Sequence, residues 1–250
     1  MKKNLFTLLL LAMALYTQAQ TTTTKKKSSL LDKINKEVKN VSGGSSTGLS
    51  NDDIIAGLKE ALTVGATNSS GKLSAADGFF KDAVVKVLMP PEAQKVEKTL
   101  RSAGLGKLVD DAILSVNRAA EDASKSAAPI FVNAIKKMSF QDALNILKGT
   151  DTAATSYLKK TTNADLTAAF KPVIEASLQK TDATKHWKAV FEKYNTLPTT
   201  FKKVNTDLTG YVTQKALDGL FYYVADEEKK IRKDPAARAS DLLKKVFGSK

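Results

Sequence analysis

The chain has 250 residues, no cysteine, a single histidine and a formal net charge of +13. The lack of cysteine excludes disulfides, thiol catalysis and thiolate metal sites, and one histidine excludes a histidine-rich metal cluster. A chain of this length can bury a sizeable core without disulfides. We therefore expect no metal site, no cofactor and no assembled catalytic residues.

Residues 1–19 have the composition of a signal peptide. Lys2 and Lys3 precede an apolar run of about a dozen residues, which is shorter than the roughly 20 residues of a membrane-spanning helix. The small residues Thr17 and Ala19 place cleavage after Ala19. We expect an exported, periplasmic protein, without a transmembrane segment in the mature chain and without a nucleic-acid partner.

Residues 20–48 are expected to form a disordered basic leader. They carry six lysines and two acidic residues and end in the Gly/Ser-rich linker SGGSSTG. An apolar stripe over residues 30–41 predicts a short amphipathic helix, which either docks on the rest of the chain or lies on an anionic membrane. Residues 49–250 carry 31 basic and 24 acidic residues. The excess of basic residues either belongs to a solvated surface or suits an envelope partner such as anionic lipid or polysaccharide.

Residues 49–250 predict one all-α domain, a multi-helix bundle with little or no β-structure. Ser50 with Asp53, and Ser139 with Asp142, have the spacing of capping boxes at helix starts. The expected helices begin at residue 50 and then cover 91–103, 107–125, 129–137, 140–148, 152–160, a segment after Thr162, 183–194, 207–233 and 235–247.

Some stretches are expected to depart from this helical pattern. Residues 65–82 are expected to be irregular, and β-branched residues in 83–89 favour an extended conformation. A helix capped by Thr162 is expected to kink at Pro172. The helix over 207–233 is apolar all round its middle, which predicts a central buried helix or, alternatively, the lining of a lipid-sized cavity.

Two patterns suggest catalytic chemistry only weakly. Ser156 and Lys159 form a Ser-x-x-Lys tetrad of the kind that penicillin-interacting serine enzymes use. The chain contains three such tetrads, about as many as its Ser and Lys content produces by chance. The acidic run 226–228 precedes two lysines and predicts a solvated, mixed-charge surface.

The helix over 107–125 carries the first candidate binding residues. Asn117 and Glu121 line one flank of its apolar stripe, and Arg118 lies nearly opposite the stripe. Such a charged row is either a solvent face or, if another helix covers it, a site where Arg118 makes several bonds. We therefore take Asn117, Arg118 and Glu121 as candidate ligand-binding residues.

Several stretches resemble the uncharacterised bacterial domain-of-unknown-function family 4197. They include LMPPEAQKVEKTLRSAGLGKLVDDA at 88–112, SVNRAAEDA at 115–123, DTAAT at 151–155, YVTQKALDGLF at 211–221 and DPAARASDLLKKVFG at 234–248. The resemblance implies an exported, helical, single-domain protein, and it supplies no activity or catalytic residues. Within it, Asp151 and Thr155 become further candidate binding residues, above all if either reaches toward Arg118.

The residues and the resemblance together favour an exported cell-envelope protein with a non-enzymatic binding or structural role. One alternative is a carrier that holds a hydrophobic or lipidic ligand inside the helical bundle. The least favoured alternative is a hydrolase that uses carboxylates or a Ser-Lys pair.

Overall fold

The computed structural model describes residues 50–180, 187, 195, 207–238 and 240–248. The predicted signal peptide, the predicted leader with its amphipathic helix, and nearly all of the helix expected at 183–194 lie outside the described residues. The chain divides into two units, Met1–Gly48 and Leu49–Lys250. Every described element belongs to the second unit.

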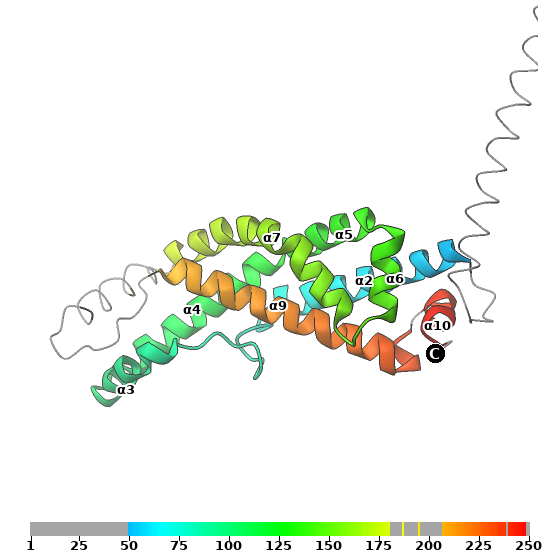
Figure 1. The fold of residues 1–250 in the computed structure, drawn as a ribbon. Coiled ribbons are helices and arrows are strands. Elements are labelled where there is room, and N and C mark those ends of the chain that lie inside the picture. The colour runs from blue at the N-terminus through cyan, green and yellow to red at the C-terminus, as the bar shows by residue number, and fades with distance from the viewer. Residues whose placement is uncertain (1–49, 181–186, 188–194, 196–206, 239, 249–250) are drawn as a thin grey trace, which may run out of the picture. The chain divides into compact units, whose positions relative to one another are not determined.

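The described part of this unit is all-α, as predicted, and contains no strand (Figure 1). In chain order its elements are α2 (Asn51–Ser74), the 3₁₀ turn η1 (Pro91–Ala93), α3 (Gln94–Ser102), α4 (Gly106–Ser124), α5 (Ala127–Lys137), α6 (Phe140–Lys148), α7 (Ala153–Lys180), α9 (Leu208–Lys233), the 3₁₀ turn η2 (Pro235–Ala237) and α10 (Asp241–Gly248).

Local capping chemistry sets several of the helix boundaries. Ser50 and Ser139 each close a reciprocal capping box with the carboxylate three residues later, as predicted. Gly104 follows α3 with φ of +80°, a left-handed conformation that glycine adopts without steric cost. The tight turn that results brings α3 against α4.

Two helices are longer than the sequence pattern indicated. The expectation of irregular structure from residue 65 is wrong up to Ser74, because α2 continues and buries Ser69 and Ser70, whose hydroxyls donate to backbone carbonyls one turn earlier. The predicted break at Thr162 is also wrong. Thr162 is buried inside the continuous helix α7, and its hydroxyl donates to the carbonyl of Leu158 instead of capping a new helix.

The last helix also begins later than predicted. Pro235 opens the short turn η2 rather than the helix itself, and α10 starts at Asp241. The backbone amide of Ala236 donates to the Asp234 carboxylate at 2.9 Å, so Asp234 caps this turn.

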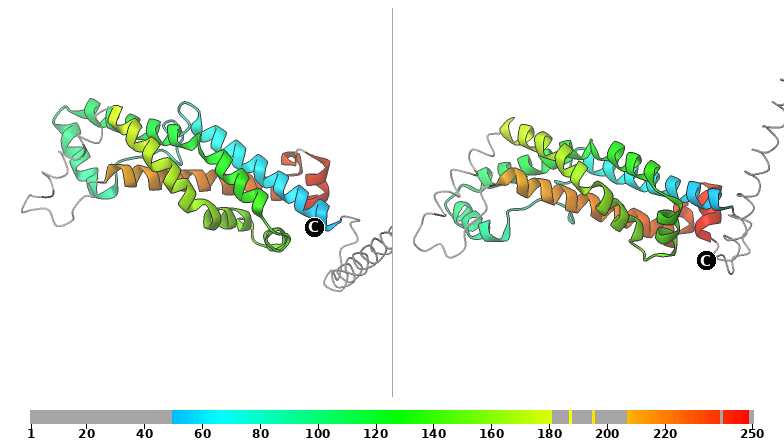
Figure 2. Two further views of the ribbon diagram at one scale, coloured as in Figure 1. Left: turned by 90° about the horizontal axis from the view of Figure 1, so that it is seen from above. Right: turned by 45° about the horizontal axis from the view of Figure 1, so that its top comes forward.

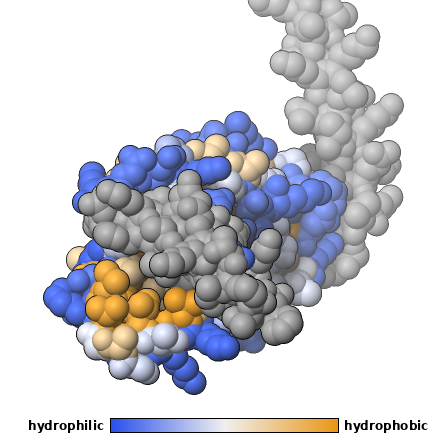
Figure 3. Space-filling model, turned by 90° about the vertical axis from the view of Figure 1, so that its left-hand side faces the viewer, coloured by the Kyte–Doolittle hydropathy of each residue, from blue (hydrophilic) through white to orange (hydrophobic). Residues whose placement is uncertain are grey.

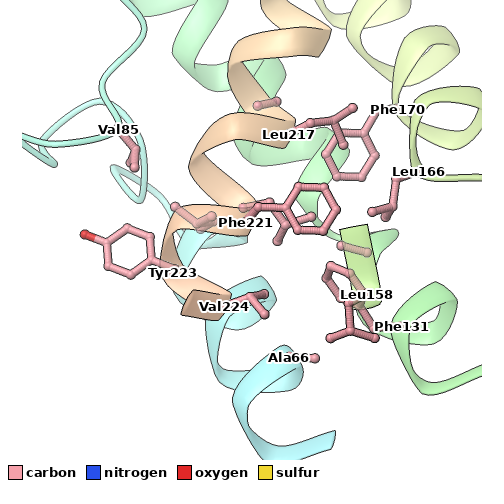
Figure 4. Packing of buried hydrophobic residues seen from close by; sticks show 14 of the residues in the cluster. Ala66, Val85, Phe131, Leu158, Leu166, Phe170, Leu217, Phe221, Tyr223 and Val224 are labelled. Carbon is pink, nitrogen blue, oxygen red and sulfur yellow. The ribbon is translucent and has the colours of Figure 1, made fainter. Parts of the chain in front are cut away.

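Helix α9 is the central element, as predicted. It packs against α7, α2 and α4, and the views in Figure 2 show it running along the length of the helical domain. Buried aromatic and aliphatic side chains converge on its middle turns (Figure 4). The rings of Phe131 and Phe221 meet edge to face with centroids 5.9 Å apart, and Phe170 is fully buried beside them.

The segment 75–90 joins α2 to η1 without regular structure, and it lies against α9 at Gly219 and Tyr223. The contact is close at Gly219, where an added Cβ would come within 2.8 Å of the Phe79 ring and 3.1 Å of Val85. Glycine is required at this position because any side chain would push the segment away from the helix.

Substitution of Gly219 by alanine is expected to lower the free energy of unfolding by about 1–3 kcal/mol, the usual cost of overpacking. Gly71→Ala is the matched control, because a Cβ there meets nothing within 4 Å and the site is exposed in a helix. We expect Gly71→Ala to be stabilising by about 0.5–1 kcal/mol. Urea unfolding of both variants measures the difference, and equal stabilities would contradict the close approach.

Candidate functional site

Three candidate residues of α4 form a polar cluster, here called the α4 network, in which Asn117 and Glu121 are buried and Arg118 is partly exposed. Asn117 is fully buried, and its side-chain amide pairs with both backbone groups of Val87 at 2.8 Å. One oxygen of Glu121 accepts from the amides of Phe79 and Phe80, both at 3.1 Å. Each buried side chain therefore satisfies backbone groups that segment 75–90 cannot pair within itself.

Arg118 connects this network to the turn after α2. Its guanidinium donates to the second oxygen of Glu121 and to the Asp77 carboxylate, each at 2.6 Å. Lys81 and Arg118 together hold the pKa of Asp77 below its usual value. Asp77 has φ of +67°, a conformation rare outside glycine, and these ion pairs hold it there.

The α4 network therefore has an internal role. The sequence suggested that another helix would cover this face if it were buried, but the irregular segment 75–90 covers it. Neither Asn117 nor Glu121 lines any of the described pockets. We infer that these residues hold segment 75–90 against the helices.

Of the other two candidates, Thr155 belongs to a separate cluster, here called the α9 network (Glu228, Arg232, Thr155), and Asp151 lies beside it. The buried Glu228 accepts from the amides of Ala154 and Thr155 and from the Thr155 hydroxyl, at 2.8–3.0 Å. These groups open helix α7, where backbone amides have no partner within the helix. A side chain of α9 thus caps the N-terminus of α7.

Arg232 completes the α9 network. Its guanidinium bonds to Glu228 at 3.0 Å and donates to the carbonyl of Ile146, at the end of α6, at 2.7 Å. One ion pair therefore caps the end of α6 and the start of α7, and fixes the corner between them to α9. Asp151 lies at that corner and pairs with Lys233 at 2.7 Å, which lowers the pKa of Asp151.

The structure corrects two expectations about this region. Asp151 and Thr155 bond to α9, not to Arg118, so the five candidates form two clusters instead of one site. Glu228 was assigned to a solvated surface, but it is buried. The missed signal is its spacing, because Glu228 follows Leu217 and Val224 on the buried stripe of α9.

A third polar cluster has no counterpart in the sequence analysis. The Tyr223 hydroxyl donates to Asp82, and the ammonium of Lys72 lies 3.3 Å from the same carboxylate and 3.6 Å from the Tyr223 ring centroid. Although burial alone would raise the pKa of Asp82, bonds from Tyr223 and the amides of Val84 and Val85 lower it. This cluster fastens segment 75–90 to α2 and α9.

The Ser-x-x-Lys tetrad has no catalytic geometry in the structure. Ser156 and Lys159 are both exposed on α7. The Ser156 hydroxyl donates to the carbonyl of Thr152 at 3.0 Å, and the Lys159 ammonium lies 5.7 Å from the Phe221 ring centroid. Neither group is positioned to activate the other.

The described pockets differ sharply in size. A pocket in the core beside Glu228 has a volume of about 20 Å³, room for about one water molecule. A groove of about 410 Å³ runs between residues 84–91 and the face of α9 that carries Tyr211, Lys215 and Tyr222. Burial raises the pKa of Tyr211 to about 12, so its hydroxyl stays protonated and donates to the carbonyl of Leu88 at 2.8 Å.

The described residues contain no group of three or more His, Cys, Asp or Glu side chains that could hold a metal ion. Among the described helices, none combines the length and the apolar character that crossing a bilayer requires.

These features define an all-α protein whose buried polar side chains bond to its own backbone, with an open groove beside an irregular segment. The chain belongs to the family described as "Protein of unknown function (DUF4197)", which it matches over residues 48–248. No curated protein and no solved structure matches the chain.

Proposed function

We propose that this chain is an exported, non-enzymatic binding module of the cell envelope, and that the groove beside residues 84–91 is its binding surface. The groove carries the proposal. Its volume of about 410 Å³ falls in the range of binding pockets, roughly 300–1,000 Å³. The polar residues that the sequence marked as candidates are engaged in holding the fold together.

The groove has the lining that a binding surface requires. Val84, Leu88 and Tyr222 give it apolar walls, and Lys86 supplies positive charge at its side. Lys215 pairs at 3.9 Å with Asp218, which also lines the groove. Its walls are held in place by the α4 network and by the Tyr211 hydroxyl bond, so the site is largely formed before a ligand arrives.

The two alternatives receive less support. A carrier that encloses its ligand in the bundle needs an interior cavity, and the core pocket beside α9 has a volume of only about 20 Å³. A Ser-Lys hydrolase needs Ser156 and Lys159 in contact, and Ser156 bonds instead to its own helix.

Photo-crosslinking in the producing cell tests the proposal. A photoreactive phenylalanine analogue at position 88 lies in the groove, and the same analogue at position 137 lies on exposed surface at the end of α5. We expect a crosslinked envelope component at position 88 and not at position 137. Equal crosslinking at both positions, or none at either, would contradict the groove as the binding surface.

A further inference from the structure

The exposed large apolar side chains of the described residues share one region of the fold. They are Val84, Leu88, Leu105, Leu108 and Tyr222, each between 43% and 60% exposed. Four of them lie between residues 84 and 108, and the fifth lines the groove beside that stretch. Exposed apolar side chains that gather in one region of a surface mark a site of interaction.

These side chains are linked across the surface. Val84, Leu88 and Tyr222 line the groove. Leu88 also lines a small second pocket together with Ala112 of α4. Ala112 lies one helical turn after Leu108. Apolar surface is gathered on the end of the helical domain that carries α3 (Figure 3). The turn between α3 and α4 presents Leu105 at its tip.

Positive charge accompanies this apolar surface. Residues 84–108 contain five basic and two acidic side chains. Arg101 and Lys107 pair with carboxylates of α3 and α4. In the described part of the chain, Lys95 and Lys98 are exposed on α3 and form no ion pair. Lys86 lies 4.2 Å from the ring centroid of Phe80 and has no described carboxylate partner either.

This combination fits a lipid surface better than a protein. Protein interfaces are enriched in aromatic residues and depleted in lysine, whereas this surface is mainly aliphatic and carries free lysines. Peripheral membrane surfaces combine buried aliphatic side chains with lysines that attract anionic headgroups.

We propose that residues 84–108 form a docking face for an anionic lipid leaflet, with Leu105 and Leu108 in the interface and Lys95 and Lys98 at the headgroups. The proposal rests on the proposed function and adds the class of its partner. The docking face is defined by Val84, Leu88, Leu105 and Leu108 with Lys86, Lys95 and Lys98.

Co-sedimentation of the exported chain with vesicles tests the docking face. The vesicles contain phosphatidylethanolamine and phosphatidylglycerol, and pure phosphatidylcholine vesicles are the neutral comparison. We expect binding to the anionic vesicles that weakens with salt. Each of the changes Lys95→Glu and Lys98→Glu should lower the partition coefficient of the protein between vesicles and water by at least about fivefold, and the double variant combines both losses.

A matched double variant at the other end of the domain controls for net charge. Lys137→Glu with Lys148→Glu makes the same charge change at exposed positions on α5 and α6, which lie away from α3 in Figures 1 and 2. We expect this control to bind nearly as well as the unchanged chain. If both double variants bind the vesicles alike, whether weakly or strongly, then the net charge of the protein or its leader causes the binding. The proposal of a docking face would then be wrong.

Tryptophan fluorescence tests insertion directly. The only native tryptophan, Trp187, is 6% exposed. Addition of anionic vesicles should shift the emission of a Leu105→Trp variant to the blue and leave a Lys137→Trp variant unchanged. An unshifted Leu105→Trp signal would overturn the proposal. A crosslink at position 88 to a protein, without vesicle binding, would retain the binding module but reject the lipid leaflet as its partner.

Discussion

Replacement of Glu228 by alanine is expected to lower the free energy of unfolding by about 3–5 kcal/mol, the cost of leaving a buried charge without its partner. Glu228 accepts from the first amides of α7 and pairs with Arg232, whose side chain is only 7% exposed. In the variant, two buried amides and one buried guanidinium lose their acceptor at the same time.

The loss should spread beyond α7 because Arg232 also caps the end of α6. Without Glu228, the guanidinium keeps its bond to the Ile146 carbonyl but remains an uncompensated charge beside the core pocket. The corner between α6 and α7 is then held mainly by the exposed pair Asp151–Lys233, and such pairs contribute about 0–1 kcal/mol.

Urea unfolding of Glu228→Ala beside Asp226→Ala separates the buried pair from ordinary surface charge. Asp226 lies two residues earlier on α9 and pairs with Lys230 at 2.8 Å on the exposed side. We expect Asp226→Ala to cost no more than about 1 kcal/mol. Similar costs for the two variants would show that Glu228 does not act as a cap for α7. Adding Arg232→Met in a double-mutant cycle measures the coupling within the pair.

The helices could be predicted from sequence because their signals are local. The capping boxes at Ser50 and Ser139 act over three residues, and the apolar periodicity of α9 spans a single element. The errors at Thr162 and after residue 65 have the same origin. A threonine followed by an acidic residue resembles a cap, and only packing around α7 decides that the helix continues.

The candidate residues could be found from sequence, but their partners could not. Asn117 and Glu121 bond to Val87 and Phe79, which lie 30 and 42 residues away in a segment without periodicity. Glu228 bonds to amides more than 70 residues distant. The position of a polar residue on the flank or stripe of a helix makes it a candidate, and the fold alone identifies which backbone groups it bonds to.

Glu121→Ala should also lower the free energy of unfolding, by about 2–4 kcal/mol, because it leaves two backbone amides without their acceptor. Its carboxylate is the shared acceptor for the amides of Phe79 and Phe80 and for Arg118. The two amides have no other acceptor in the described contacts, whereas Arg118 keeps its bond to Asp77. Segment 75–90 would lose one of its attachments to α4 and would keep two others there, the bonds of Asn117 to Val87 and of Arg118 to Asp77.

Asp111→Ala on the same helix is the control, because Asp111 makes only an exposed pair with Lys107. We expect it to cost no more than about 0.5 kcal/mol. Urea unfolding gives the global effect, and hydrogen exchange at the amides of Phe79 and Phe80 gives the local one. Unchanged protection of these two amides in Glu121→Ala would contradict the proposed attachment, even if the variant were less stable.

The local measurement also bears on the groove, because the same segment forms its wall. If Glu121→Ala frees residues 79–90 while the helices remain folded, crosslinking from position 88 should fall with the loss of protection. The α4 network would then influence binding only by positioning Leu88 and Val84. Crosslinking that persists at full strength with the segment released would show that α9 alone supplies the binding surface.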